Sequence, residues 1–206
     1  MAKSKTKLIK NYIQELPEGS IIALCDFNEI AEPKTISKVL TRLTKKGFIK
    51  KVFRAVYWKQ GENTDEIDIN LVAEAIARNN GWEIISTKET ALVNIGLKDE
   101  NESDYTYLTD GSNRTYKIEG KTINFRHNTS VNAQNLSKES KVVIEVLKAY
   151  NSQDWNAESI NTVKSNFSPK QTKKIVYETR YMRRKFRNMI QAGTKSENKL
   201  EKKMES

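Results

Sequence analysis

A helical apolar repeat followed directly by two β-rich runs is the feature that most constrains this chain. Between residues 33 and 46 the apolar side chains recur at the spacing of one buried helix face; they are Ile36, Val39, Leu40 and Leu43. Pro33 suits the first turn of such a helix, and Gly47 suits its end. The pattern therefore predicts an amphipathic helix over residues 33–46.

Two short β-rich runs follow this helix, at residues 48–52 and 56–59, and they are joined around Arg54 and Ala55. Runs of this length separated by a tight connection predict a hairpin. The preceding residues add the elements of a known arrangement. The expected order is a helix over residues 5–16, a β-rich run over 20–24, a brief helix from Asp26 to Ala31 capped by Asp26, the 33–46 helix and the hairpin. This order predicts a winged helix-turn-helix domain over residues 1–60.

The polar side of the 33–46 helix carries short hydroxyls and long cations and no acid. The set is Lys34, Thr35, Ser37, Lys38, Thr41, Arg42 and Lys45. The hairpin adds Lys51 and Arg54. Because such side chains donate hydrogen bonds to phosphates and base edges, we expect double-stranded DNA as the partner, with the early helix residues reaching bases and the later cations phosphates. A solvated basic helix in an unrelated small domain is the alternative.

After a polar stretch at residues 60–65, the chain changes to the pattern of an α+β domain over residues 66–192. Its expected elements are a helix at 67–79 with Leu71, Val72, Ala75 and Ile76 inward, a strand at 82–86, a helix at 89–97, three antiparallel strands at 105–109, 114–118 and 121–126 in a meander, and then further helices. Residues 193–206 have no apolar stripe and are expected to be disordered. The predicted fold class is therefore α+β, with an N-terminal winged helix-turn-helix, a small domain with antiparallel strands, and C-terminal helices.

The last predicted helix opens at Ser168-Pro169 and is expected to run to about Gln191. One side of it is basic, with Lys173, Tyr177, Arg180, Arg183, Arg184 and Arg187. Such a side can be a solvated face, a second nucleic-acid surface that combines phosphate contacts with stacking, or a dock for an acidic protein.

The net charge of +10 is unevenly distributed along the chain. Residues 1–60 hold 13 Lys and Arg against 5 acids, residues 61–140 hold 8 against 14, and residues 141–206 hold 15 against 7. Two basic ends suggest a polyanionic partner. With mean hydropathy of −0.71, no membrane-spanning run and no secretory signal, we expect a cytoplasmic protein.

Few residues suit metal or nucleophilic chemistry. The single cysteine, Cys25, cannot form an internal disulfide and is expected to be a structural thiol, and the single histidine, His127, rules out most triad and zinc arrangements. We therefore expect no cofactor and no enzymatic activity. The enzymatic alternative is a metal-dependent DNA nuclease that uses Asp110, Glu119 and Lys121, although Glu119 falls where a hairpin turn is expected.

Three stretches together resemble the antitoxins of bacterial AbiE-type, or type IV, toxin–antitoxin systems, which act in abortive infection. They are TISKVLTRLTKKGFIKKVFRAVYWK, LVAEAIARNNGWEIISTKETALVNIGL and YTYLTDGSNRTYKIEGKTINFRH. The resemblance covers roughly residues 5–130 and departs from the family at Arg54-Ala55, where Arg-Gly is common.

This resemblance implies a repressor that binds repeated operator DNA upstream of its own operon. It also implies that the C-terminal region counteracts a nucleotidyltransferase-like toxin, without direct contact in the usual type IV scheme. A protein-interaction antitoxin that binds its toxin directly is the alternative.

Overall fold

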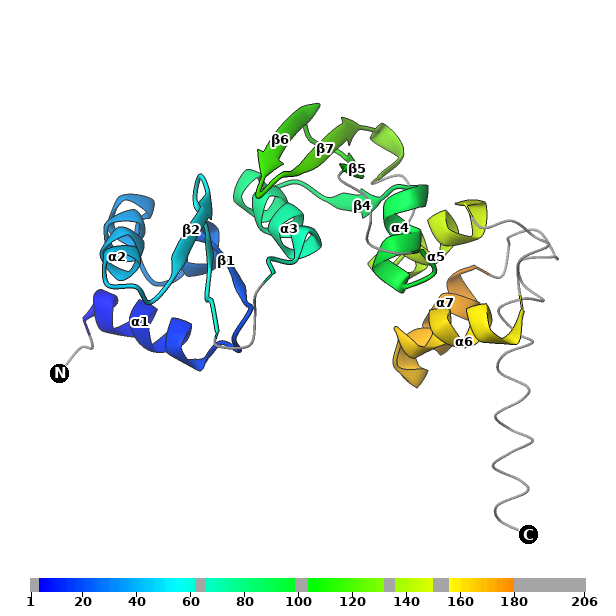
Figure 1. Ribbon diagram of the computed structural model, residues 1–206, viewed down its shortest axis with the longest axis horizontal. Helices are drawn as coiled ribbons and strands as arrows, with labels where there is room; N and C mark the ends of the chain where they lie inside the picture. The colour runs from blue at the N-terminus through cyan, green and yellow to red at the C-terminus, as the bar shows by residue number, and fades with distance from the viewer. Residues whose placement is uncertain (1–3, 62–65, 99–103, 132–135, 150–155, 180–206) are drawn as a thin grey trace, which may run out of the picture. The chain divides into compact units, whose positions relative to one another are not determined.

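The computed structural model describes residues 4–61, 66–98, 104–131, 136–149 and 156–179. These residues form helices and two largely antiparallel sheets (Figure 1), which confirms the predicted α+β class. The chain divides into two compact units, Met1–Ile84 with Thr109–His127 and Ile85–Leu108 with Asn128–Ser206. The sequence-based boundary at residues 60–65 thus lies inside the first unit.

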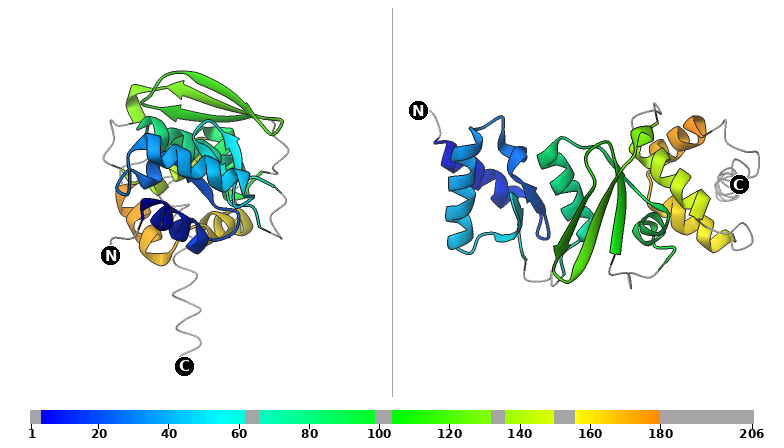
Figure 2. Two further views of the ribbon diagram at one scale, coloured as in Figure 1. Left: turned by 90° about the vertical axis from the view of Figure 1, so that its left-hand side faces the viewer. Right: turned by 90° about the horizontal axis from the view of Figure 1, so that it is seen from above.

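The first unit begins with six elements in the expected order. They are α1 (Lys5–Glu15), β1 (Ile21–Ala23), the 3-10 turn η1 (Leu24–Phe27), α2 (Pro33–Lys45), β2 (Lys50–Phe53) and β3 (Val56–Trp58). The strands form an antiparallel sheet in the order β1-β3-β2, with Ile22 opposite Tyr57. α1 and α2 pack together (Figures 1 and 2), and Ile9 and Ile13 of α1 join Ile36 and Leu40 of α2 in one buried cluster.

The helix α2 forms as its apolar repeat predicts. Its buried residues are Ile36, Val39, Leu40 and Leu43. Pro33 occupies the first turn, and Gly47 ends the helix with a φ of 73°. The Gly47 amide donates to the Thr44 carbonyl at 3.0 Å, and the Phe48 amide donates to the Leu43 carbonyl at 3.0 Å, so these two carbonyls near the end of the helix are satisfied.

The prediction of a brief helix capped by Asp26 is wrong. Only the 3-10 turn η1 forms there, and residues 28–30 form turns. Asp26 sits inside η1 and accepts a hydrogen bond from the Ala23 amide at 2.8 Å. A carboxylate that points backward to the start of its own turn cannot cap a helix that starts after it.

The helix α3 (Ile69–Asn80) also belongs to the first unit. The Asp68 carboxylate caps it, accepting from the Asn70 amide at 2.8 Å, and Gly81 ends it with a φ of 68°. Leu71 was expected in the core but is 41% exposed. The buried face instead includes Ile69, Val72 and Ile76, and a residue two positions after Ile69 lies on the opposite side of the helix.

Four strands form the second sheet: β4 (Ile84–Ser86), β5 (Asp104–Thr109), β6 (Arg114–Ile118) and β7 (Lys121–His127). Glu119 and Gly120, with φ of 49° and 79°, make the expected two-residue turn between β6 and β7, and Tyr116 pairs with Ile123. The predicted meander is wrong, because the strand order is β4-β5-β7-β6 and β5 is not next to β6.

The second unit is mainly helical, with α4 (Lys88–Ile95), the 3-10 turn η2 (Thr129–Val131), α5 (Lys138–Ala149), α6 (Ala157–Ser165) and α7 (Pro169–Glu178). Val143 and Leu147 of α5 pack with Ile175 of α7. The Ser168 hydroxyl caps α7 as predicted, accepting from the Gln171 amide at 3.3 Å.

The helix α7 ends at Glu178, whereas the sequence predicted a helix to about residue 191. Residues 180–206, with the predicted tail, lie outside the described residues. Within the described ranges, no helix is both long and apolar enough to cross a membrane.

Candidate nucleic-acid interface

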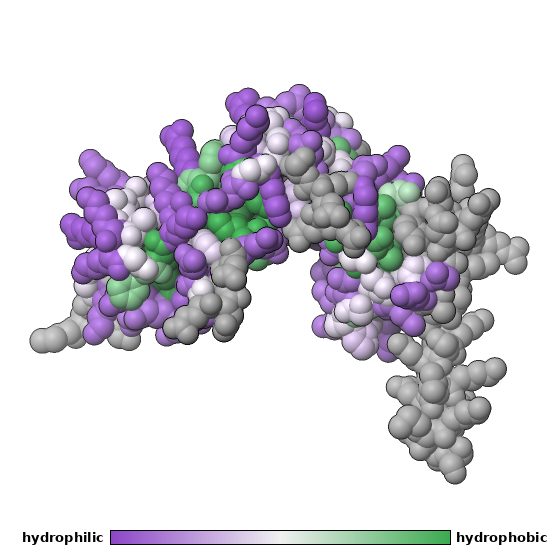
Figure 3. Space-filling view, viewed as in Figure 1, coloured by the Kyte–Doolittle hydropathy of each residue, from purple (hydrophilic) through white to green (hydrophobic). Residues whose placement is uncertain are grey.

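The exposed side of α2 presents the residues that the sequence singled out. Lys34, Thr35, Lys38, Thr41, Arg42 and Lys45 are exposed, and Ser37 is half-buried. Hydrophilic side chains accordingly cover the outer side of α2 (Figure 3). Among residues that the structure places, none of the α2 lysines or Arg42 forms an ion pair with a carboxylate. These cations are therefore available to an external anion.

The hydroxyl of Thr41 is partly committed within the helix. Its Oγ1 donates to the Ser37 carbonyl at 2.8 Å. An oxygen that already donates its hydrogen still offers lone pairs and the adjacent methyl group. Thr41 can therefore accept a hydrogen bond or contact an apolar group, whereas its neighbour Arg42 is purely a donor.

The β2–β3 hairpin adds two exposed cations, Lys51 and Arg54. Its turn places Ala55 in the left-handed region at φ 60°, where alanine is unfavourable relative to glycine. The antiparallel register shifts between Lys51 and Phe53, so β2 contains an irregularity just before the turn. The Arg54 side chain is thus carried by a strained turn at the tip of the hairpin.

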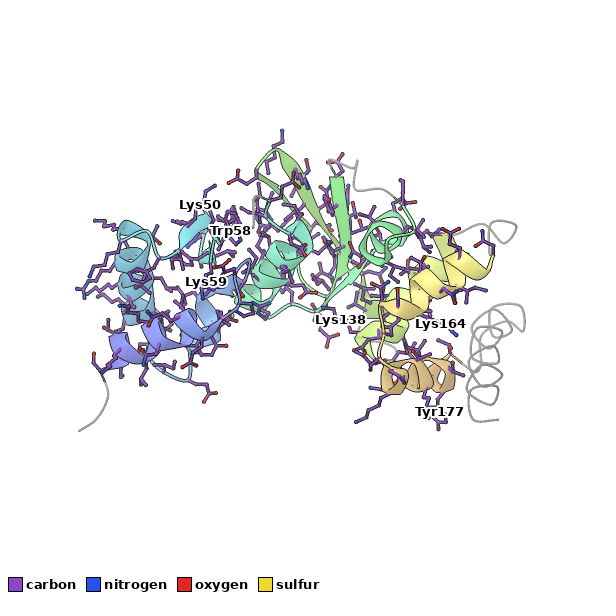
Figure 4. All side chains as sticks on the ribbon, turned by 60° about the horizontal axis from the view of Figure 1, so that its bottom comes forward. Lys50, Trp58, Lys59, Lys138, Lys164 and Tyr177 are labelled. Atoms are coloured by element: carbon purple, nitrogen blue, oxygen red, sulfur yellow. The ribbon has the colours of Figure 1, made fainter. Side chains whose placement is uncertain are left out.

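The outer strand of this hairpin is supported from its side by the β6–β7 hairpin. The rings of Phe53 and Tyr116 lie 4.9 Å apart between centroids. Lys50 pairs with Glu119 at 3.2 Å and lies 5.9 Å from the centre of the Trp58 ring (Figure 4). Two of these contacts join β2 to the β6–β7 hairpin within the first unit.

Nine Lys and Arg and no acid occur between residues 33 and 60. Two of the nine have partners within the protein (Figure 4). Lys50 pairs with Glu119. The Lys59 ammonium donates to the Gln14 carbonyl at 2.8 Å and to the Leu16 carbonyl, at the end of α1. The other seven are exposed. Lys46, which follows α2, is one of them; the sequence prediction omitted it although its charge was visible.

The cysteine and the buried tyrosine of this unit have no features of a reactive site. Burial, followed by the negative charge of Asp26, raises the pKa of the Cys25 thiol. Burial also raises the pKa of the Tyr57 hydroxyl. Both groups therefore stay protonated at neutral pH, and a raised thiol pKa lowers the thiolate fraction that reacts.

The second predicted basic surface is described only in part. Lys173 and Tyr177 are both exposed, one turn apart on α7, and Tyr177 is 64% exposed (Figure 4). Four members of the predicted set, Arg180, Arg183, Arg184 and Arg187, lie outside the described residues.

The residues of the nuclease alternative have other partners. Glu119 pairs with Lys50, and Asp110 accepts a hydrogen bond from the Glu83 amide at 2.8 Å. No three metal-ligating side chains gather in the part of the chain that the structure describes. Both acids therefore make contacts to other segments of the first unit.

Comparison with known proteins gives one match to a family. Residues 8–175 match DUF6088, which is described as a family of unknown function. None of the curated proteins matches the chain. The match covers both units and most of the described residues, and the chain therefore belongs to the DUF6088 family.

Proposed function

We propose that the first 60 residues form a winged helix that binds double-stranded DNA, with α2 as the recognition helix and the β2–β3 hairpin as the wing. The order α1, β1, a short helical turn, α2, β2 and β3 supports this proposal, as does the β1-β3-β2 sheet order. In winged helix-turn-helix proteins the second helix of the motif enters the major groove. The protein acts in this proposal as a non-enzymatic transcriptional regulator.

One observation carries the proposal: α2 buries one face completely and exposes a face of cations and hydroxyls. Ile36 and Leu40 have no exposed surface, whereas Lys38 and Arg42 are exposed and lack an ion-pair partner among the described residues. A core-packing helix needs exposed polar residues, but it does not need every charge on that side to be positive. A surface of this kind is electrostatically suited to the phosphate backbone and to guanine edges.

The proposed division of roles follows from position along α2. Lys34, Thr35 and Lys38 lie in the first two turns, which enter the groove first in this class of protein, and would reach base edges. Arg42 and Lys45 lie in the last turn and would contact phosphates. The exposed Arg54 at the tip of the wing would contact the adjacent backbone or minor groove.

Single substitutions on α2 test this proposal. We expect Lys38→Ala to weaken binding to the DNA upstream of the protein's own gene by about 1–3 kcal/mol, or roughly 5–150-fold. Arg42→Ala should weaken binding to any duplex and lower the slope of log affinity against log salt by about 1. Fluorescence anisotropy with a labelled duplex measures the affinity. Lys88→Ala, which removes one exposed charge at the start of α4, is the matched control and should have little effect. Equal affinities for all four proteins would contradict the proposed site.

The wider biological role is proposed from the resemblance to AbiE-type antitoxins. In that proposal the protein represses its own operon and counteracts a nucleotidyltransferase-like toxin encoded beside it. Co-expression tests this role directly: the protein should restore growth to cells that produce the neighbouring toxin. Persistent growth arrest with both proteins present would remove the antitoxin role and leave the DNA-binding proposal intact.

A further inference from the structure

We propose that the end of α3 belongs to the DNA-binding module. Its residues Arg78 and Asn79 are positioning residues: they hold the wing and the turn before α2 in place. This inference rests on the proposed function for its consequence in DNA binding. Its structural content is independent, because it concerns how the hairpin turn is held in the free protein.

Asn79 connects two segments that are distant from it in the sequence. Its Nδ2 donates to the Ala55 carbonyl at 2.9 Å, and its Oδ1 accepts from the Cys25 amide at 3.1 Å. Ala55 follows Arg54 directly, and Cys25 lies inside η1. One side-chain amide therefore contacts both the turn of the wing and the segment that leads into α2.

The carbonyl of Ala55 receives a second hydrogen bond from the same region. The Leu24 amide donates to it at 3.0 Å. Both lone pairs of this carbonyl are therefore used. Because Ala55 has a positive φ that alanine disfavours, the two bonds help to hold a conformation that the residue would otherwise leave.

Arg78 makes the parallel connection to η1. Its Nε and Nη2 donate to the two carboxylate oxygens of Asp26, at 3.1 and 3.2 Å. The same Asp26 carboxylate accepts from the Ala23 amide. Two-pronged contact of this kind fixes orientation as well as distance.

The other end of this connection is anchored in the core. The α3 residues Val72, Ala75 and Ile76 are buried, and α3 packs on β1, β3 and η1. Arg78 and Asn79 therefore extend from a buried helix to η1 and to the turn of the β2–β3 hairpin. Loss of Asn79 should leave α3 in place and release the hairpin tip that carries Arg54.

The first experiment measures the hairpin tip in the free protein. Trypsin cleaves after Arg54, and Asn79→Ala should increase the rate of this cleavage several-fold. Asn80→Ala is the matched control, because the Asn80 side chain donates to Ile76 within its own helix. Arg78→Gln removes the bidentate contact to Asp26 but keeps a polar side chain, and it provides a second variant if Asn79→Ala does not fold. Cleavage after Arg54 that is unchanged in both variants would overturn the inference.

The second experiment is a double-mutant cycle on DNA binding. Asn79→Ala and Arg54→Ala should each weaken binding. Each should also reduce the slope of log affinity against log salt by about 0.9, the value for one phosphate contact. The double variant should bind no more weakly than Arg54→Ala alone, because Asn79 acts through the wing. Fully additive losses would overturn the positioning role. If cleavage after Arg54 increases but the unaltered protein binds no DNA, the positioning role stands and the proposed function fails.

Discussion

The strained turn of the hairpin gives a quantitative prediction for Ala55→Gly. Ala55 has a φ of 60°, and a non-glycine residue in this region costs about 1–2 kcal/mol. Glycine removes that cost, but its greater conformational entropy stabilises the unfolded chain by about 0.4–1 kcal/mol. The midpoints of the two ranges differ by about 0.8 kcal/mol, so we predict a stabilisation of about 0.5–1 kcal/mol, provided that the hydrogen bonds to the Ala55 carbonyl from Leu24 and Asn79 are kept.

Thermal unfolding followed by circular dichroism tests this prediction. For a chain of this size a stabilisation of 0.5–1 kcal/mol corresponds to an increase in Tm of about 1–4 °C. Ala77→Gly is the control, because Ala77 is buried in α3 and should lose about 1 kcal/mol or more. A lower Tm for Ala55→Gly would show that the turn does not hold a strained alanine, and would refute the argument.

Two further predictions concern stability outside the candidate interface. Burial favours a higher pKa for Glu178, but hydrogen bonds from Ser137, at 2.6 and 2.8 Å, and from Ser140, together with the charge of Lys174, lower the pKa from 4.5 to about 2. The ionised form therefore stabilises the fold above pH 4.5, and the stabilisation is lost as the pH falls towards 2. Glu178→Gln should lower the free energy of unfolding, measured with urea, by about 1–2 kcal/mol at pH 7 and by almost nothing at pH 2. An equal decrease at both pH values would contradict this. A Cβ on Gly111 would overlap the Trp82 indole, so Gly111→Ala should cost about 1–3 kcal/mol and change the near-ultraviolet circular dichroism, and an unchanged Tm would contradict this packing.

The sequence alone was sufficient for elements whose signals are local. The α2 repeat predicted its four buried residues because a helix that packs on a core displays its period directly. Ser168-Pro169, Gly47 and Glu119-Gly120 marked an N-terminus, a C-terminus and a turn for the same reason. The exposed members of the candidate interface followed from the same period.

Long-range contacts were the part that sequence patterns did not contain. Asp26 has the residue type of a helix cap, but its carboxylate bonds Ala23 and Arg78, and the pairing with Arg78 joins residues 52 positions apart. The link from Asn79 to Cys25 spans 54 positions. An asparagine near a helix end is ordinarily explained as a terminating residue, so nothing local indicates that this one fixes the turn of a hairpin.

Binding of the purified protein to its own upstream DNA, compared with a scrambled duplex of equal length and composition at two salt concentrations, tests the central claim most directly. Purely electrostatic binding weakens steeply with salt and is equal for both duplexes. The winged-helix account predicts a preference for the upstream duplex that increases at the higher salt, and that Lys38→Ala reduces. Equal binding to both duplexes at both salt concentrations would contradict it.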